Sequence, residues 1–146
     1  MDGVIPALGP NAQQQDLGGP PMVVPMDDKE TVIDITGGAY HSAVLTQTGR
    51  ILTWGAAQLG QLGRPIPTKN EKGDYEHSDS SGLPVDPIPR PARGIPASEK
   101  VRALGAGFYN TFALCQSGKV YCTGENQNEQ CGKTGPANLH QLTLVK

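Results

Sequence analysis

The sequence predicts an all-β protein in which one antiparallel unit occurs twice. Residues 32–64 and 101–133 align without a gap, and ten of the 33 aligned positions are identical. The identities include the pairs Gly38/Gly107, Gly49/Gly118, Gly55/Gly124 and Gly63/Gly132. Composition agrees, because aromatic residues make up only 5% of the 146 residues, whereas Gly and Pro number 19 and 13. Few aromatics and many turn-forming residues are typical of short strands joined by turns.

Each repeat contains three short apolar segments that predict strands. In the first repeat they are residues 31–35, 42–46 and 50–54, and the loop Gln47-Thr48-Gly49 separates the last two. A three-residue hairpin loop with glycine in the left-handed conformation commonly joins antiparallel strands. The second repeat has the same order, with strands over 101–104, 111–115 and 119–123 and the loop Gln116-Ser117-Gly118. Two units of three to four strands predict a partial β-propeller of two antiparallel blades, with a long loop inserted between them.

The composition of the remaining segments divides the chain into four parts. Residues 1–30 form a Pro-rich N-terminal segment, in which Met22-Val23-Val24 predicts an edge strand because prolines flank it. Residues 31–64 are the first propeller repeat, and residues 65–100 are a polar and Pro-rich insertion loop. Residues 101–146 are the second repeat and a tail. Within the insertion, Ser78–Gly82 favours a mobile loop.

Charge and cysteine content exclude several functional classes. The net charge of −2 excludes a globally basic nucleic-acid-binding protein. No apolar run approaches the roughly 20 residues that span a bilayer, and the N-terminus lacks the pattern of a signal peptide. Cys115, Cys122 and Cys131 match no metal-binding spacing, and their odd number favours a reducing compartment over a disulfide framework. We therefore expect no membrane contact, no metal site and no cofactor.

Several motifs follow one another in a fixed order in the first repeat. They are Gly38-Ala39-Tyr40-His41-Ser42, the hairpin Gly49, Trp54-Gly55 and Gly60-Gln61-Leu62-Gly63. This combination resembles the repeat of the regulator of chromosome condensation family. The resemblance implies a seven-bladed propeller of four-stranded blades in complete members. By that comparison the chain is similar to a central fragment of about two blades.

The resemblance also implies a function and partners. It implies that the protein is not an enzyme, or is at most a guanine-nucleotide exchange factor that acts without covalent catalysis. The partner would be a small GTPase of the Ran type, and chromatin is a second candidate. Location would be nuclear by resemblance and cytoplasmic otherwise. Two alternatives stay open, namely a non-catalytic protein-interaction module and a truncated gene product without exchange activity. Because two blades cannot close a propeller, we also expect self-association or pairing with other propeller fragments.

The candidate GTPase-facing residues are those that match the family's binding face. They are Tyr40 and His41, together with Asp2, Gly3, Val4 and Ile5, which look like the trailing end of the family's protruding wedge. Ran-specific members carry an acid where this chain has Tyr40, and a phenol supplies no carboxylate charge near neutral pH. A packing role shared by Tyr40 and Tyr109, and turn hydrogen bonding by His41 and Asn110, are the structural alternatives.

The resemblance places candidate chromatin contacts in the insertion loop, at Lys69 and Lys72. A run of acids follows these two lysines, although phosphate binding depends on net cationic contacts. The remaining candidates are structural repeat residues: Gly38, Gly49, Trp54, Gly55, Gly60, Gly63, Gly107, Gly118, Gly124 and Gly132.

Overall fold

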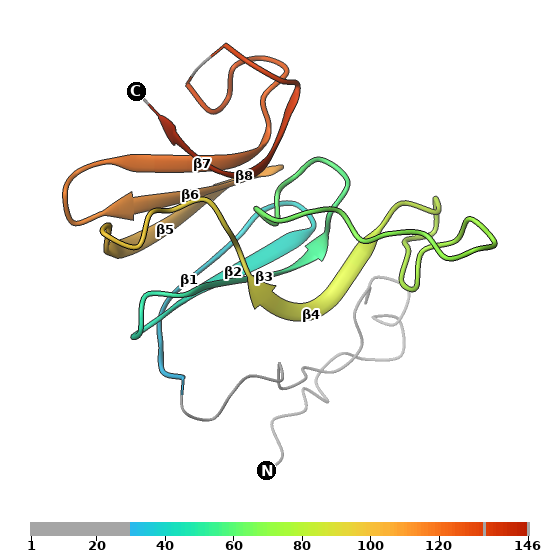
Figure 1. Ribbon diagram of the computed structural model, residues 1–146, viewed down its shortest axis with the longest axis horizontal. Coiled ribbons are helices and arrows are strands. Elements are labelled where there is room, and N and C mark those ends of the chain that lie inside the picture. The colour runs from blue at the N-terminus through green and yellow to red at the C-terminus, as the bar shows by residue number, and fades with distance from the viewer. Residues whose placement is uncertain (1–29, 133, 146) are drawn as a thin grey trace, which may run out of the picture.

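A computed structural model describes residues 30–132 and 134–145 as two four-stranded antiparallel sheets (Figure 1). The first sheet has the order β1-β2-β3-β4 and the second has the order β5-β6-β7-β8. The strands are β1 (Val32–Gly37), β2 (His41–Thr46), β3 (Ile51–Ala56), β4 (Val85–Pro91), β5 (Val101–Gly107), β6 (Asn110–Cys115), β7 (Val120–Glu125) and β8 (Asn138–Val145). The predicted all-β fold with two antiparallel blades is confirmed.

The first sheet draws its fourth strand from a part of the chain that the sequence analysis placed in the insertion loop. Strand β4 pairs with β3, with Leu52 opposite Pro91 and Gly55 opposite Asp86. A strand at the edge of a sheet has only one neighbour, so prolines within it cost few hydrogen bonds. The prolines are therefore the reason that no strand was predicted here, although an edge strand tolerates them.

The two sheets repeat each other in register as well as in strand order. His41 lies opposite Gly55 in the first sheet, and Asn110 lies opposite Gly124 in the second. Both hairpins close as predicted, because the amide of Gly49 donates to Thr46 and the amide of Gly118 donates to Cys115. These two glycines have φ angles of 91° and 89°, a conformation that costs glycine little.

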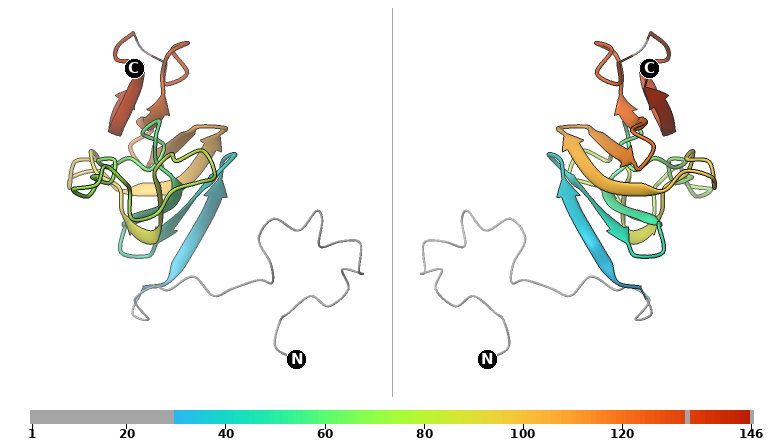
Figure 2. Two further views of the ribbon diagram at one scale, coloured as in Figure 1. Left: turned by 90° about the vertical axis from the view of Figure 1, so that its right-hand side faces the viewer. Right: turned by 90° about the vertical axis from the view of Figure 1, so that its left-hand side faces the viewer.

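The two sheets lie side by side (Figure 2), and the main hydrophobic cluster contains residues of both. Ala43, Leu45 and Ile51 of the first sheet belong to one buried cluster with residues of the second sheet, among them Ala113 and Tyr121. The first strands of the two sheets are also joined, because the backbone amide of Leu104 on β5 donates to the Asp34 carboxylate on β1 over 2.8 Å.

The two sheets contact each other through faces that are not equivalent in the repeat. Ala43, Leu45 and Ile51 face the second sheet, but their repeat equivalents Phe112, Leu114 and Val120 alternate with the residues of the second sheet that face the first. Successive residues of a strand point to opposite faces. Each sheet therefore offers a different face to its neighbour, as successive blades of a propeller do.

The insertion between β3 and β4 contains two tight turns of the same kind. The Asn70 side-chain oxygen accepts the amides of Lys72 and Asp74, and the Asp79 carboxylate accepts those of Ser81 and Leu83. Side chains of Asn and Asp commonly fix turns in this way. Asp79 therefore closes the turn over Ser78–Gly82 with two hydrogen bonds, and the mobility of this loop stays a prediction.

Some sequence predictions fall on residues 1–29, outside the described part of the chain. They are the edge strand at Met22-Val23-Val24 and the wedge candidates Asp2, Gly3, Val4 and Ile5. Among the described residues, no helix is long and apolar enough to cross a membrane.

Candidate functional site

Three connections of the chain meet at one edge of the two sheets. They are the β1–β2 turn with Tyr40, the β5–β6 turn with Phe108 and Tyr109, and the long β3–β4 connection. The Ala39 amide donates to the Phe108 carbonyl over 2.9 Å, which fixes the two turns beside each other. Tyr40 is 70% exposed and Phe108 is 77% exposed. The edge therefore presents large aromatic side chains to solvent.

A pocket of about 480 Å³ opens at this edge, between the turns and the β3–β4 connection. Tyr40 and Tyr109 line it from the turns, and Gln58, Asp79 and Leu83 line it from the connection. Tyr109 packs edge-to-face against Phe108, with ring centroids 6.3 Å apart. We call the edge, including this pocket, the aromatic face.

His41 follows Tyr40 in the sequence but points away from solvent. Its Nε2 lies 2.9 Å from the Thr111 hydroxyl, and that hydroxyl donates to the Gln61 carbonyl over 2.7 Å. Because the Thr111 proton is used on Gln61, His41 Nε2 must carry the proton that it donates to Thr111. Burial lowers the pKa of His41, which favours this neutral ring. Of the two candidates, only Tyr40 is accessible to a partner.

Only glycine fits at residue 38, three positions before His41. A Cβ atom at residue 38 would collide with the His41 ring and with the Gly107 carbonyl of the second blade. Glycine therefore lets the imidazole lie across the chain and reach the neighbouring blade.

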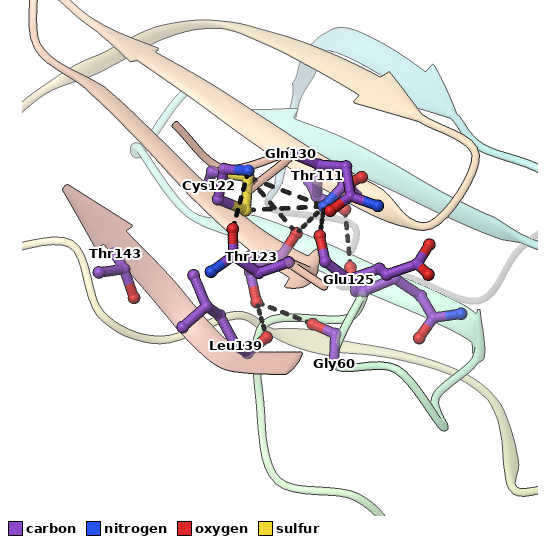
Figure 3. Close-up of a disulfide and its surroundings, with 12 residues drawn as sticks. Gly60, Thr111, Cys122, Thr123, Glu125, Gln130, Leu139 and Thr143 are labelled. Carbon is purple, nitrogen blue, oxygen red and sulfur yellow. Dashed lines mark hydrogen bonds between the residues drawn. A yellow bond between two sulfur atoms is a disulfide. The ribbon is translucent and has the colours of Figure 1, made fainter. Parts of the chain in front are cut away.

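The segment from Gly60 to Gly63 joins the blades through its carbonyls. The Thr123 hydroxyl lies 2.7 Å from the carbonyls of both Gly60 and Leu139, as Figure 3 shows. Leu62 and Gln61 are buried in the same segment. The aromatic face therefore rests on an interface that these buried hydrogen bonds hold together.

A buried ion pair fixes the β3–β4 connection to the first sheet. Arg64 donates to the Asp86 carboxylate over 2.7 Å and to the Thr53 carbonyl over 2.7 Å, and both charged residues are only 7% exposed. Burial opposes ionisation of Asp86, but the hydrogen bonds from Arg64 and from the Ile88 amide hold its pKa below the usual value. No sequence pattern predicts this pair, because its residues lie 22 positions apart and follow no repeat.

The second blade fixes the corresponding connection with a disulfide between Cys122 and Cys131 (Figure 3). The expectation that the cysteines stay unpaired is therefore wrong for these two, and Cys115 is free and buried. Their spacing of nine residues says nothing by itself, but β7 and the following turn bring them together. Asn110, at the repeat position of His41, donates to the Glu125 carbonyl of its own sheet over 2.7 Å.

The candidate chromatin residues lie in the first turn of the insertion. The Lys69 ammonium lies 5.2 Å from the centre of the Tyr75 ring, and Lys72 lies within the turn that Asn70 organises. Neither lysine lines the pocket of the aromatic face. Among the described residues, no group of three His, Cys, Asp or Glu side chains could hold a metal ion.

The structural repeat residues occupy turns and strand ends. All the candidate glycines except Gly38 and Gly107 have positive φ angles. Trp54 is half-buried and lies opposite Ser42, on the face of its sheet turned away from the second blade.

Comparison with known proteins gives the family. A model described as the regulator of chromosome condensation (RCC1) repeat matches residues 32–61 and 101–130. The chain is an RCC1-repeat protein. Protein pim1 of Schizosaccharomyces pombe is 33% identical over 101 residues, which are 69% of this chain and 16% of pim1. The mitochondrial RCC1 domain-containing protein RUG3 of Arabidopsis thaliana is 29% identical over 131 residues, which are 89% of this chain and 25% of RUG3.

A solved structure shares the fold of this RCC1-repeat chain. Prp20p from Saccharomyces cerevisiae has a TM-score of 0.70 and 22% sequence identity, covering 88% of this chain and 28% of Prp20p. Prp20p itself is described as binding Gsp1p and histones. The chain spans only 16% to 28% of the lengths of pim1, RUG3 and Prp20p.

Proposed function

We propose that this RCC1-repeat chain contributes a non-catalytic protein-binding surface, and that the aromatic face is that surface. The observation that carries the proposal is the exposure of Tyr40 and Phe108 on neighbouring turns that a backbone hydrogen bond holds together. Exposed aromatic side chains on a rigid support are typical of the residues that dominate binding energy at protein interfaces. The buried contacts of His41 beneath them supply the rigidity.

We propose a small GTPase of the Ran type as the partner. The support is family membership and the binding of Gsp1p described for Prp20p. Binding need not include nucleotide exchange, because Tyr40 stands where the resemblance expects an acid. A phenol cannot replace a carboxylate charge near neutral pH. The chain would then bind the GTPase without accelerating nucleotide release.

Biolayer interferometry with the full chain and a Ran-type GTPase tests this proposal. We expect Tyr40→Ala and Phe108→Ala each to weaken binding about tenfold, the effect of losing a strong interface contact. Gln116→Ala, on the exposed hairpin turn between β6 and β7, should leave binding unchanged. No binding by the unaltered chain, or equal loss in all three variants, would refute the aromatic face as the site.

Release of a fluorescent GDP analogue from the same GTPase separates binding from exchange. We expect no acceleration by the unaltered chain. Tyr40→Asp restores the acid at the expected position and serves as the comparison. Acceleration by the unaltered chain would establish exchange activity and contradict the proposal of binding alone.

Chromatin contact and nuclear location stay predictions. Lys69 lies against Tyr75, and Glu71, Asp74 and Glu76 surround the two lysines in sequence, so the loop offers little net positive charge. Nucleosome binding that falls in Lys69→Ala and Lys72→Ala would support a contact there. Microscopy of the tagged chain tests its location. The mitochondrial name of one relative, RUG3, makes this test necessary.

Self-association is also proposed, because strand β1 leaves apolar side chains exposed. Ile33 and Ile35 are 56% and 68% exposed on this strand. Exposed apolar patches favour association. Sedimentation that depends on protein concentration would support self-association, and a well-dispersed monomer at every concentration would contradict it.

A further inference from the structure

The pocket of the aromatic face has walls of two kinds. Tyr40 and Tyr109 supply aromatic rings from the two turns, and Leu83 adds an apolar side chain from the β3–β4 connection. Gln58 and Asp79 supply polar groups from the same connection. With a volume of about 480 Å³, the pocket holds one large side chain and the backbone that carries it.

Gln58 and Asp79 offer hydrogen-bond acceptors in this pocket. The side-chain oxygen of Gln58 is buried and has no hydrogen-bond partner. A buried acceptor without a donor is destabilising, so a ligand donor that the Gln58 amide turns to meet relieves that cost. Asp79 adds a negative charge, and none of the described residues that line the pocket carries a positive charge. The complementary ligand is therefore a cation with several donors.

The two tyrosines favour the same kind of ligand. A cation positioned over an aromatic ring is attracted by the negative charge of the ring face. The insertion loop already contains such a contact between Lys69 and Tyr75. A guanidinium group is flat, stacks on rings and offers five donors in a fixed geometry, whereas an ammonium group is compact and more strongly hydrated. Arginine therefore matches the rings, the Gln58 oxygen and the Asp79 charge together.

We propose that this pocket receives an arginine side chain from an extended segment of a protein partner. The inference rests on the proposed use of the aromatic face, and it adds the chemistry that the face recognises. The guanidinium stacks on a tyrosine ring, donates to the Gln58 oxygen and lies near the Asp79 carboxylate. Leu83 and the second tyrosine cover the methylene groups of the arginine side chain.

Two matched peptides test the proposal on the full chain. One is acetyl-Gly-Gly-Arg-Gly-Gly-amide, and the other carries citrulline, which has the shape of arginine without its charge. In two-dimensional ¹H–¹⁵N NMR titrations, we expect the arginine peptide to shift the Gln58 side-chain amide and the backbone amides of Ser81 and Leu83. Its Kd should be at least about fivefold lower than that of the citrulline peptide, the smaller effect expected at an open site.

Variants of the chain separate the charge of the pocket from its shape. Asp79→Asn removes the charge but keeps the oxygen that accepts the amides of Ser81 and Leu83, so the turn should persist. We expect Asp79→Asn and Tyr40→Ala each to raise the Kd of the arginine peptide about fivefold or more. Tyr40→Phe should bind nearly as well as the unaltered chain, and Gln116→Ala should not differ from it.

Several results would overturn the inference. They are the absence of shifts in the pocket, equal affinity for the arginine and citrulline peptides, or no effect of Asp79→Asn with its turn amides unmoved. A lysine peptide that binds as tightly as the arginine peptide would overturn the choice of a guanidinium. The inference and the proposed function can fail separately. GTPase binding that persists without arginine selectivity refutes only the pocket's ligand, and arginine binding without GTPase binding refutes only the partner.

Discussion

Cys122 and Cys131 in the second blade occupy the repeat positions of Thr53 and Leu62 in the first. In the first blade, the Thr53 hydroxyl donates to the Leu62 carbonyl over 2.7 Å, and it accepts a hydrogen bond from Arg64 Nε over 3.2 Å. In the second blade a covalent bond joins the same two positions. Both devices hold the chain after the third strand against that strand. Equivalent connections are therefore secured by different chemistry in the two blades.

Reduction of the disulfide should destabilise the second blade. A cross-link that closes a loop of about ten residues contributes about 2.7 kcal/mol by restricting the unfolded chain. We expect Cys131→Ala to lower the free energy of unfolding by about 2–3 kcal/mol in urea titrations without reductant. In excess reductant the unaltered chain should approach the variant. Cys115→Ser is the control, since Cys115 forms no disulfide, and it should retain its response to reductant.

Removal of the Asp86 charge should destabilise the first blade more strongly. Asp86→Asn leaves Arg64 buried without a counter-charge, and breaking such a pair costs about 3–5 kcal/mol. The exposed Asp74 is the matched control, because Asp74→Ala should change the free energy of unfolding by less than about 0.5 kcal/mol. An Asp86→Asn chain as stable as the Asp74→Ala chain would contradict a structural role for the ion pair.

The Asp86 pair also predicts how stability depends on acid. The pKa of Asp86 is held below its usual value, so the folded state binds fewer protons than the unfolded state. This contribution is complete above the unfolded pKa of about 3.9 and is lost as the pH falls through the lower folded value. We expect the difference in unfolding free energy between the unaltered chain and Asp86→Asn to shrink below about pH 4. A difference that stays constant down to strongly acidic pH would contradict this.

Local patterns predicted most of the fold from sequence, but not the contacts that join distant segments. The glycine-closed hairpins at Gly49 and Gly118 depend on a few neighbouring residues, and the repeat showed each of them twice. Strand β4 was missed because Pro89 and Pro91 are poor strand formers, and only pairing with β3 makes them part of a sheet.

The candidate site was predictable only in part, and for the same reason. Tyr40 and His41 are predicted together from sequence, because they are neighbours in one motif. Successive side chains along an extended chain point in opposite directions, and Thr111 contacts the His41 ring. Tyr40 therefore faces solvent, whereas His41 is buried. The role of Asp79 depends on how the insertion folds back beside both turns, which no local pattern encodes.

Replacement of His41 by asparagine, the residue at the equivalent position of the second repeat, should remove a pH dependence of stability. The pKa of buried His41 lies below about 6.5, so the unfolded chain binds a proton before the folded chain does. Stability is therefore full above about pH 6.5 and declines as the pH falls toward the folded pKa. We expect His41→Asn to flatten the dependence of the unfolding free energy on pH below about pH 6.5, relative to the unaltered chain.

The other histidines provide the control for that experiment. His77 and His140 are exposed, so His140→Asn is the matched control, with the same substitution made outside the contact between the blades. His41→Asn should also lower stability at about pH 8, because it removes the hydrogen bond to Thr111 that crosses between the blades. An unchanged profile in His41→Asn would mean that His41 carries no linked proton.

Glycine at residue 129 should stabilise the chain. Glu129 has a φ angle of 56°, the only positive value among the described non-glycine residues, and its repeat equivalent Gly60 has a φ angle of 85°. The left-handed conformation costs a residue with a Cβ about 1–2 kcal/mol, part of which glycine gives back as entropy in the unfolded chain. We expect Glu129→Gly to raise the free energy of unfolding by about 0.5–1 kcal/mol in urea titrations.

Two further variants separate the backbone effect at Glu129 from the loss of its side chain. Glu129→Ala removes the hydrogen bond from Thr134 but keeps the Cβ, so it should not gain stability. Gly60→Ala makes the converse change in the first blade, where a Cβ would collide with the Leu139 carbonyl. It should therefore lose about 1–3 kcal/mol. If Glu129→Gly and Glu129→Ala were equally stable, backbone strain at residue 129 would be ruled out.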